Sequence, residues 1–144
     1  MPNYISFNKP EISIDNSNNI HIIWCAESDP INKGPNLLLY RLWNIEDQIW
    51  TPSLEETPFL LAKNVISHSI NTDSTGKVHI VWSSGNEEDG YSIYYKNSDN
   101  LITLEREMIY SSEYPISISR IEVDSNNNLH LIWVEKGNEF GFFE

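Results

Sequence analysis

Asp124 to Trp133 reads D-S-N-N-N-L-H-L-I-W, and two related stretches precede it: D-N-S-N-N-I-H-I-I-W at Asp15 to Trp24 and D-S-T-G-K-V-H-I-V-W at Asp73 to Trp82. In every copy the His follows the Asp by six residues and the Trp follows it by nine. The copies start 58 and 51 residues apart, so the chain is an array of three units of roughly fifty residues each.

The pattern between these stretches predicts an all-β protein. Helical periodicity is nearly absent, and alternating or β-branched runs are separated by Asn, Asp, Gly, Ser and Pro. Four strands per unit are expected, at Glu11–Asp15, Ile20–Cys25, Leu37–Trp43, Gln48–Thr51, Ser69–Asp73, Val78–Ser83, Tyr91–Lys96, between Leu101 and Tyr110, and at Arg120–Asp124, Leu129–Glu135 and Phe140–Phe143. Pro52–Asn64 is expected to be an irregular connection.

We treat residues 1–144 as one repeat domain. Its expected parts are a closing strand at 3–8, a first blade at 9–64, a second at 65–115 and a third at 116–144 that lacks its outer strand. The stretch Asn3–Asn8, N-Y-I-S-F-N, stands where a fourth strand would lead into the next unit. This offset is typical of a β-propeller closed by a strand from the opposite terminus.

Four strands per unit, with an Asp–turn–apolar–His–apolar–apolar–Trp signature, resemble the sialidase-like (BNR-type) β-propeller repeats of bacterial proteins. The resemblance covers almost the whole chain and implies propeller architecture without implying an activity. One departure is that the sialidase Asp box, S-x-D-x-G-x-x-x-W, places its Trp about six residues after the Asp. Here the spacing is nine, and Gly76 is present in one copy alone.

Three blades are too few to close a ring, because propellers close with about four to eight. Six is the multiple of three in that range. We therefore expect a half-propeller whose copies associate head to tail into a six-bladed homodimer, each Asn3–Asn8 strand completing the third blade of the other copy. The alternatives are a fragment of a longer propeller and closure by further subunits.

The net charge and the cysteine content limit which molecules the protein could bind and which covalent links it could form. The net charge of −12 disfavours nucleic acid and anionic membranes, and otherwise serves solubility. Cys25 is a single thiol, so no internal disulfide can form. No signal peptide is visible, which indicates a cytoplasmic protein if the chain is full-length and an extracellular one if it was cut from a longer exported protein. No cofactor is expected.

The repeated residues are expected to be structural. The turns after Asp15, Asp73 and Asp124 offer oxygens at alternate positions, but they lack the Gly and Glu of a calcium loop. Asp and Asn suit tight turns because they tolerate positive φ. His21, His79 and His130 occupy one place per blade, which separates them, so they are expected to form structural hydrogen bonds between blade layers and no metal site. Trp24, Trp82 and Trp133 are expected to fill the wedges between blades.

Unrepeated residues are the better candidates for ligand binding, since the architecture does not require them. They are Trp43, Trp50, Tyr91, Tyr94, Tyr95 and Arg120. The loops Ala26–Asn36, Ser84–Gly90 and Lys136–Asn138 differ between units and are expected on one face with the connections between blades. Aromatic planes beside Asn, Asp, Glu and Arg suit sugars. For Trp43 and Trp50 the alternative is packing between outer strands.

The sequence therefore predicts a non-catalytic, lectin-like module that binds carbohydrate on the loop face. One alternative is a sialidase-like glycoside hydrolase, which would need three converging arginines and a Tyr–Glu nucleophile pair. Arg41, Arg106 and Arg120 are present, but Arg41 and Arg106 fall in outer strands, and no motif assigns a catalytic residue. Another alternative is a protein-interaction or structural scaffold.

Overall fold

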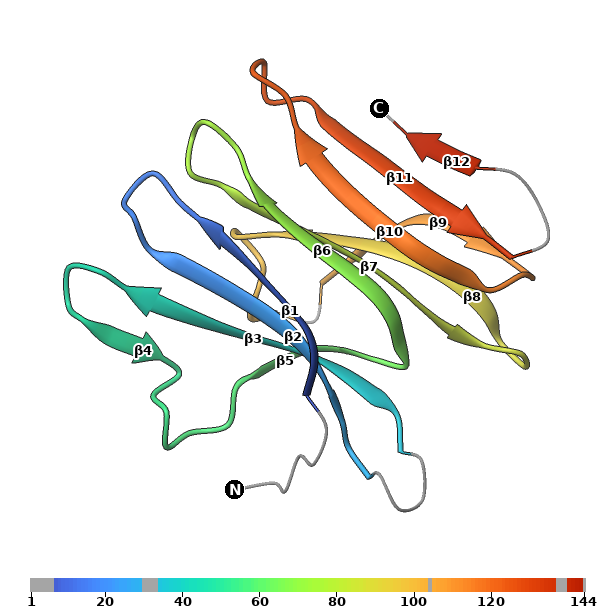
Figure 1. The fold of residues 1–144 in the computed structure, drawn as a ribbon, viewed down its shortest axis with the longest axis horizontal. Helices are drawn as coiled ribbons and strands as arrows, with labels where there is room; N and C mark the ends of the chain where they lie inside the picture. The colour runs from blue at the N-terminus through green and yellow to red at the C-terminus, as the bar shows by residue number, and fades with distance from the viewer. Residues whose placement is uncertain (1–6, 30–33, 104, 137–139, 144) are drawn as a thin grey trace.

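The computed structural model describes residues 7–29, 34–103, 105–136 and 140–143, and over these residues the chain is all β (Figure 1). The strands form three antiparallel sheets, one per repeat, which we name sheets A, B and C in chain order. The described residues include no helix that could cross a membrane.

Sheet A consists of the strands of the first repeat: β1 (Phe7–Ile14), β2 (Ile20–Glu27), β3 (Asn36–Asn44), β4 (Ile49–Thr51) and β5 (Phe59–Lys63). The outer edge of β3 has two partners, because Leu42 pairs with Thr51 of β4 and Leu37 pairs with Lys63 of β5. The prediction of an irregular connection at Pro52–Asn64 was therefore wrong. The apolar run F-L-L-A within this stretch forms the rest of the outer edge, after a connection without regular structure that begins at Pro52.

Sheets B and C follow the same order. Sheet B consists of β6 (Val65–Thr72), β7 (Val78–Asn86), β8 (Gly90–Asn97) and β9 (Glu107–Ser112). Sheet C consists of β10 (Ile116–Val123), β11 (Leu129–Glu135) and β12 (Phe140–Phe143).

The first strands of the second and third units are longer than predicted. They begin at Val65 and Ile116, several residues before the expected starts at Ser69 and Arg120. Each contains a register shift in this added part, and a bulge breaks the alternation on which a strand prediction depends.

The expected closing strand Asn3–Asn8 lies mostly outside the described residues. Its last two residues belong to β1, where Phe7 pairs with Ala26 and Asn8 pairs with Cys25 of β2. Strand exchange therefore stays a prediction for residues 3–6. Among the described strands, β12 pairs with β11 alone.

The three sheets pack face to face. Successive strand residues point to opposite faces, so the His and the Trp of each repeat, three residues apart, define a His face and a Trp face. The His face of sheet A packs on the Trp face of sheet B, where Ile23 and Tyr40 join a buried cluster with Trp82. The His face of sheet B packs on the Trp face of sheet C, where Val81 clusters with Trp133. Burial of these apolar faces is the main source of stability.

The loops gather at two opposite ends of the sheets (Figure 1). The β1–β2, β6–β7 and β10–β11 hairpins, which contain the repeated Asp, form what we call the turn end. At the other end, the loop end, the β7–β8 turn lies against the connection between sheets A and B, where the Gly85 amide donates to the Asn64 carbonyl at 3.3 Å. Likewise the Lys136 amide donates to the Pro115 carbonyl at 2.8 Å.

Candidate functional site

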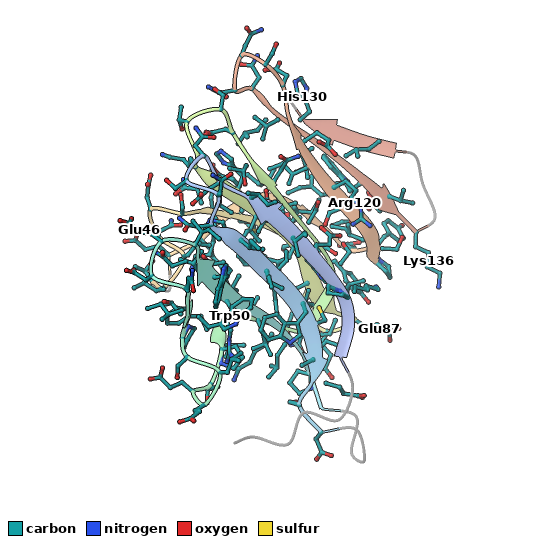
Figure 2. All side chains as sticks on the ribbon, turned by 60° about the vertical axis from the view of Figure 1, so that its left-hand side comes forward. Glu46, Trp50, Glu87, Arg120, His130 and Lys136 are labelled. Carbon is teal, nitrogen blue, oxygen red and sulfur yellow. The ribbon has the colours of Figure 1, made fainter. Side chains whose placement is uncertain are left out.

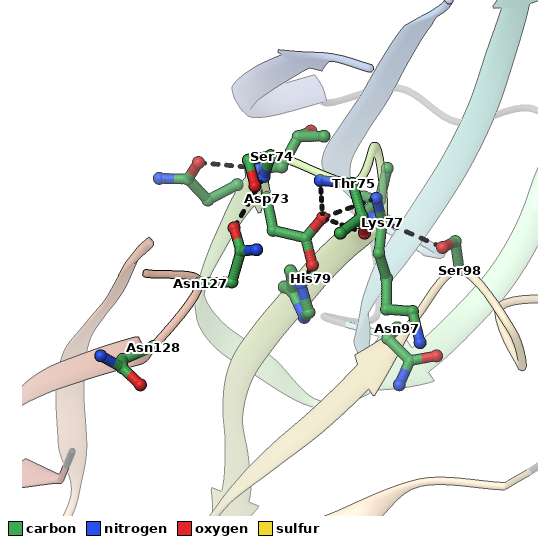
Figure 3. Close-up of polar contacts among 12 residues, drawn as sticks. Asp73, Ser74, Thr75, Lys77, His79, Asn97, Ser98, Asn127 and Asn128 are labelled. Atoms are coloured by element: carbon green, nitrogen blue, oxygen red, sulfur yellow. Dashed lines mark hydrogen bonds and ion pairs between the residues drawn. The ribbon is translucent and has the colours of Figure 1, made fainter. Parts of the chain in front are cut away.

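The repeated Asp organises each hairpin at the turn end. In the second repeat Asp73 Oδ1 accepts hydrogen bonds from the backbone amides of Thr75 and Lys77, at 2.8 and 3.0 Å (Figure 3). Asp73 Oδ2 lies 3.0 Å from His79 Nε2, and His79 Nδ1 lies 2.7 Å from the Tyr95 hydroxyl. The His side chain is thus held between a carboxylate and a phenol.

The same network occurs in the first repeat, and its Asp–His contact recurs in the third. His21 joins Asp15 and Tyr40, at 3.1 and 2.8 Å. His130 again lies 3.1 Å from its Asp, but the position equivalent to the tyrosine is Phe142, which has no hydroxyl group. These partners belong to the sheet of the His itself, whereas the sequence analysis expected them between layers.

These hydrogen bonds keep the repeated carboxylates ionised. Burial opposes ionisation of Asp15 and Asp73, but the hydrogen bonds that they accept outweigh it and hold the pKa of each below its usual range. At Asp124 the bonds from Asn128 and His130 lower the pKa in the same direction. Each carboxylate is already occupied by donors from its own turn, which fits a turn better than a calcium loop.

Neighbouring turns are joined to one another. Asn16 Nδ2 donates to the Ser74 carbonyl at 2.5 Å, and the Ser74 amide donates to Asn127 Oδ1 at 2.9 Å. The fourth residue of each turn has positive φ, at Asn18 (63°), Gly76 (86°) and Asn127 (63°). This confirms that the turns use residues that tolerate the left-handed region.

Two of the predicted ligand residues lie at the turn end. Trp43 and Trp50 are cross-strand neighbours on β3 and β4, with ring centroids 5.2 Å apart and planes inclined by 56°. Trp43 pairs with Ile20, the first residue after the Asp15 hairpin (Figure 2 shows Trp50). Both side chains are half-buried against each other at the sheet edge, which agrees with the alternative of packing between outer strands.

The three tyrosines of the second repeat have different surroundings. Tyr91 is buried between sheets B and C, and Tyr95 binds His79. Tyr94 and Tyr91 border two different grooves, one on each side of the β7–β8 turn. The ring of Tyr94 stacks with Trp82 at 5.7 Å, and the guanidinium of Arg106 lies 4.3 Å from its centroid. The structure therefore does not bring Tyr91, Tyr94 and Tyr95 into one aromatic surface.

Arg120 lies on β10, apart from Trp50 (Figure 2). Its Nη1 lies 3.3 Å from Glu11 Oε1 and donates to the His68 carbonyl at 3.1 Å, so it links the first strands of all three sheets. Arg41 is buried on β3, and Arg106 covers Tyr94. The three arginines belong to different surroundings and form no common carboxylate clamp.

Cys25 and His68 form a close thiol–imidazole pair, with Sγ and Nδ1 3.4 Å apart. Burial raises the pKa of Cys25 to about 11 and lowers the pKa of His68. Both groups are therefore neutral at pH 7. An active cysteine needs the thiolate form, which burial disfavours here, and the pair forms a buried hydrogen bond between sheets A and B.

An open groove of about 460 Å³ lies at the loop end between β5 of sheet A and the β7–β8 turn of sheet B. Among its described lining residues, those with polar or aromatic side chains are Lys63, Asn64, Ser84, Asn86, Asp89, Ser92, Tyr94 and Arg106. Amide, ammonium, guanidinium and carboxylate groups therefore surround one half-exposed aromatic ring. This groove contains the mixture of groups that the sequence analysis expected for the loop face.

The β7–β8 turn that forms one wall of the groove is held by its own hydrogen bonds. Asn86 Oδ1 accepts from the amides of Glu88 and Asp89 at 2.8 and 2.9 Å, and its Nδ2 donates to Asp89 Oδ2 at 2.9 Å. Gly85 has a φ of 146°, and a Cβ there would lie 2.2 Å from the Gly90 carbonyl oxygen. Glycine is required because the two strands approach so closely.

A second groove, of about 700 Å³, lies on the other side of the same turn, against β9. Its carboxylates are Glu87, Glu88, Asp89 and Glu113, and Figure 2 shows Glu87 at the loop end. In the part of the chain that the structure describes, no group of three or more His, Cys, Asp and Glu side chains is placed to hold a metal ion.

The chain is similar in fold to an endo-arabinase. The crystal structure of the endo-arabinase from Bacteroides thetaiotaomicron VPI-5482 matches with a TM-score of 0.58 and 15% sequence identity. The match covers 95% of this chain and 54% of that chain, so the chain spans about half the length of the endo-arabinase. No family model matches the sequence, and no curated protein matches it.

Most of the groove residues were not predicted from the sequence. The Ser84–Gly90 loop and Tyr94 were predicted, but Lys63, Asn64 and the position of Arg106 beside Tyr94 were not. One available signal was the pair of glycines that flank N-E-E-D at Asn86–Asp89, which marks a tight turn with an unrepeated polar tip.

Proposed function

We propose that this protein is a non-catalytic carbohydrate-binding module whose three sheets are blades of a β-propeller. The observation that carries this proposal is the loop-end groove, where a tyrosine ring is bordered by Lys63, Asn64, Asn86, Asp89 and Arg106. The likeness to an endo-arabinase in fold supports the choice of carbohydrate among the ligands that such a groove could hold.

The groove has the size and chemistry for one or two sugar rings. Small-molecule sites commonly enclose about 300–1,000 Å³ and combine apolar surface with a few polar groups. Asn64 presents an amide, and Lys63 and Arg106 add donors for hydroxyl oxygens. The Asn86 amide is used within its own turn and shapes the wall of the groove. Tyr94 stacks with Trp82 and is covered by the guanidinium of Arg106, so the planar guanidinium is the group that a sugar would meet at this point of the groove.

Binding is favoured over hydrolysis in this groove because of its carboxylates. Glycosidases generally use two carboxyl groups about 5–9.5 Å apart. Asp89 is the one carboxylate among the described residues that line the groove, and it is already hydrogen-bonded to Asn86.

A second candidate function is glycoside hydrolysis, favoured by the likeness to an endo-arabinase. It would have to use the neighbouring acidic groove, where Glu87, Glu88 and Glu113 supply carboxylates. The sialidase version has less support, because Arg41, Arg106 and Arg120 lie in separate surroundings.

The test is an NMR titration of the labelled protein with soluble oligosaccharides, including arabino-oligosaccharides, after selection on a glycan array. Shifts confined to residues 63–64, 86–90 and 106 are expected. Arg106→Ala should weaken binding by about tenfold or more, because a charge-assisted hydrogen bond and the Tyr94 cover are both lost. Lys136→Ala, which removes a cation at the loop end outside the groove, should leave the affinity unchanged.

Three results would count against the proposal. They are no binding to any glycan, shifts that map to the Trp43–Trp50 pair instead, and release of reducing ends from an oligosaccharide by the wild-type protein. The last result would support the hydrolase, and its loss in Glu113→Gln would place the reaction in the acidic groove.

A further inference from the structure

The β1 part of the Trp face of sheet A is uncovered among the described residues, although the equivalent positions are buried in the other two sheets. Elsewhere on this face Ala26, Leu37 and Leu39 form a small buried cluster with Trp24. Ile12 of β1 is 61% exposed. Its equivalents, Ile70 of β6 and Ile121 of β10, are 7% and 2% exposed, because the preceding sheet covers them. Ile14 of β1, on the same face, is exposed as well. Sheet A therefore exposes apolar β1 side chains at positions that are covered by a neighbouring sheet in the other two repeats.

The His face of sheet C shows the reverse arrangement. Ile132 of β11 is 49% exposed, whereas its equivalents Ile23 and Val81 are 0% and 1% exposed beneath the sheet that follows. Inside the chain, residues at the position of Ile132 pack on the Trp face of the next sheet. The uncovered His face of sheet C is thus of the kind that fits the uncovered β1 part of the Trp face of sheet A.

We propose that a second copy of this chain occupies these faces, with the His face of sheet C on the Trp face of sheet A of the other copy. The two faces are on opposite sides of one chain, so each copy cannot satisfy its own. Two copies related by a two-fold axis form the contact twice and close a ring of six sheets. This inference is independent of what the loop-end groove binds.

The turn end supplies a polar contact for the same pairing. Asn127 of the third turn accepts a hydrogen bond from the amide of Ser74 in the preceding turn. Asn18 holds the equivalent place in the first turn, with the same φ of 63°. Ser125 is the equivalent of Ser74, so Asn18 of one copy is expected to accept from the Ser125 amide of the other.

The apolar content of the faces explains why a copy would dock. Ile12, Ile14 and Ile132 are exposed β-branched side chains on sheet faces, and their burial would contribute about 25 cal/mol per Å². The chain covers 54% of the endo-arabinase chain that it resembles, so a second copy would supply a comparable amount of further structure.

Sedimentation equilibrium on the full chain measures the outcome. The wild type is expected at twice 16.7 kDa at micromolar concentration. Ile132→Asp and Ile12→Asp should each raise the dimer dissociation constant by about a hundredfold or more, because each places a charge in both contacts. Ile102→Asp is the matched control: Ile102 is also exposed, but it lies in the β8–β9 loop away from both faces, and this variant should remain dimeric. Circular dichroism checks that every variant keeps its β structure.

A mixture of the Ile132→Asp and Ile12→Asp variants tests whether the copies associate head to tail. Its result can be interpreted separately from the result for each variant by itself. Ile132→Asp leaves the Trp face of sheet A intact, and Ile12→Asp leaves the His face of sheet C intact. The mixture should therefore associate more tightly than either variant by itself, through one wild-type contact. A monomeric wild type, a larger or open-ended assembly, or a dimer that neither variant weakens would overturn the proposal.

Discussion

At the scale of single residues, the repeated Asp, His and Trp fix the conformation of the first hairpin of each sheet and its packing. Asp73 shows how the carboxylate does this: it accepts two backbone amides of its own turn and orients His79, which in turn binds Tyr95. A charged acceptor strengthens each of these bonds. The network is local, so it forms wherever the Asp-to-His spacing of six residues is kept.

The pH dependence of stability should report this network. The folded-state pKa of Asp73 lies below its unfolded value of about 3.9, so its contribution is complete above about pH 5 and declines as the pH falls below that. Asp15 and Asp124 act in the same direction. Urea unfolding between pH 7 and pH 3 should therefore show a steep loss of stability in acid.

Asp73→Asn tests the assignment of this loss. The amide keeps an acceptor for the turn but has no charge, so it should cost about 1 kcal/mol at pH 7 and reduce the decline in acid. Identical acid slopes for the variant and the wild type would contradict the assignment. Glu46→Gln, at an exposed site on the β3–β4 turn, serves as the control for removal of a surface carboxylate.

The repeated hairpins could be predicted from the sequence, whereas the loop-end groove largely could not. The hairpin turns, their positive φ residues and the burial of Trp82 and Trp133 follow from spacing that recurs three times. The surroundings of Tyr94 do not, because Arg106 reaches it from the end of the β8–β9 loop, and loop geometry depends on packing that has no period. Trp43 and Trp50 were predicted to bind ligand because they are unrepeated, but strand direction places them at the turn end, away from the loop-end groove.

At the scale of the elements, bulges and breaks separate the predicted strands from the observed ones. The outer edge of sheet A is divided between two short strands, β4 and β5, which pair with different parts of β3. Strands this short lack the length and the alternation of apolar residues from which a strand is predicted. The β7–β8 turn was easier to place because Gly85 and Gly90 flank it. Of the two, Gly85 is the stricter requirement, since its missing Cβ lets the strands approach.

Gly85→Ala should therefore destabilise the protein by about 2–3 kcal/mol and disturb the groove, because the new methyl group would meet the backbone of Gly90. Gly76→Asn is the comparison. Two other repeats carry Asn in that turn position at positive φ, and the nearest contact is the exposed Asn16 side chain, so the cost should stay below about 1 kcal/mol. Thermal and urea unfolding measure both; equal effects would contradict this account of Gly85.

At the scale of the whole molecule, the described sheets form a row in which each contacts its neighbours and the two outermost faces differ in kind. If a second copy covers these faces, unfolding is coupled to dissociation. The midpoint of thermal unfolding should then rise with protein concentration for the wild type. For Ile132→Asp the midpoint should be lower and nearly independent of concentration. A wild-type midpoint that stays constant over a hundredfold range would contradict coupled unfolding.

The bonds between neighbouring turns, from Asn16 to Ser74 and from Ser74 to Asn127, bear on how copies of the chain would stack if they associate as proposed. A stack with unlike ends is polar, and such a stack either bends back on itself or continues as a fibre, depending on the rotation from one layer to the next. These short polar links lie at one rim and help to set that rotation. Loss of one side-chain amide at the turn end would change this rotation. A closed ring of copies would then be replaced by a filament, so substitutions at the turn end are the ones expected to cause polymerisation.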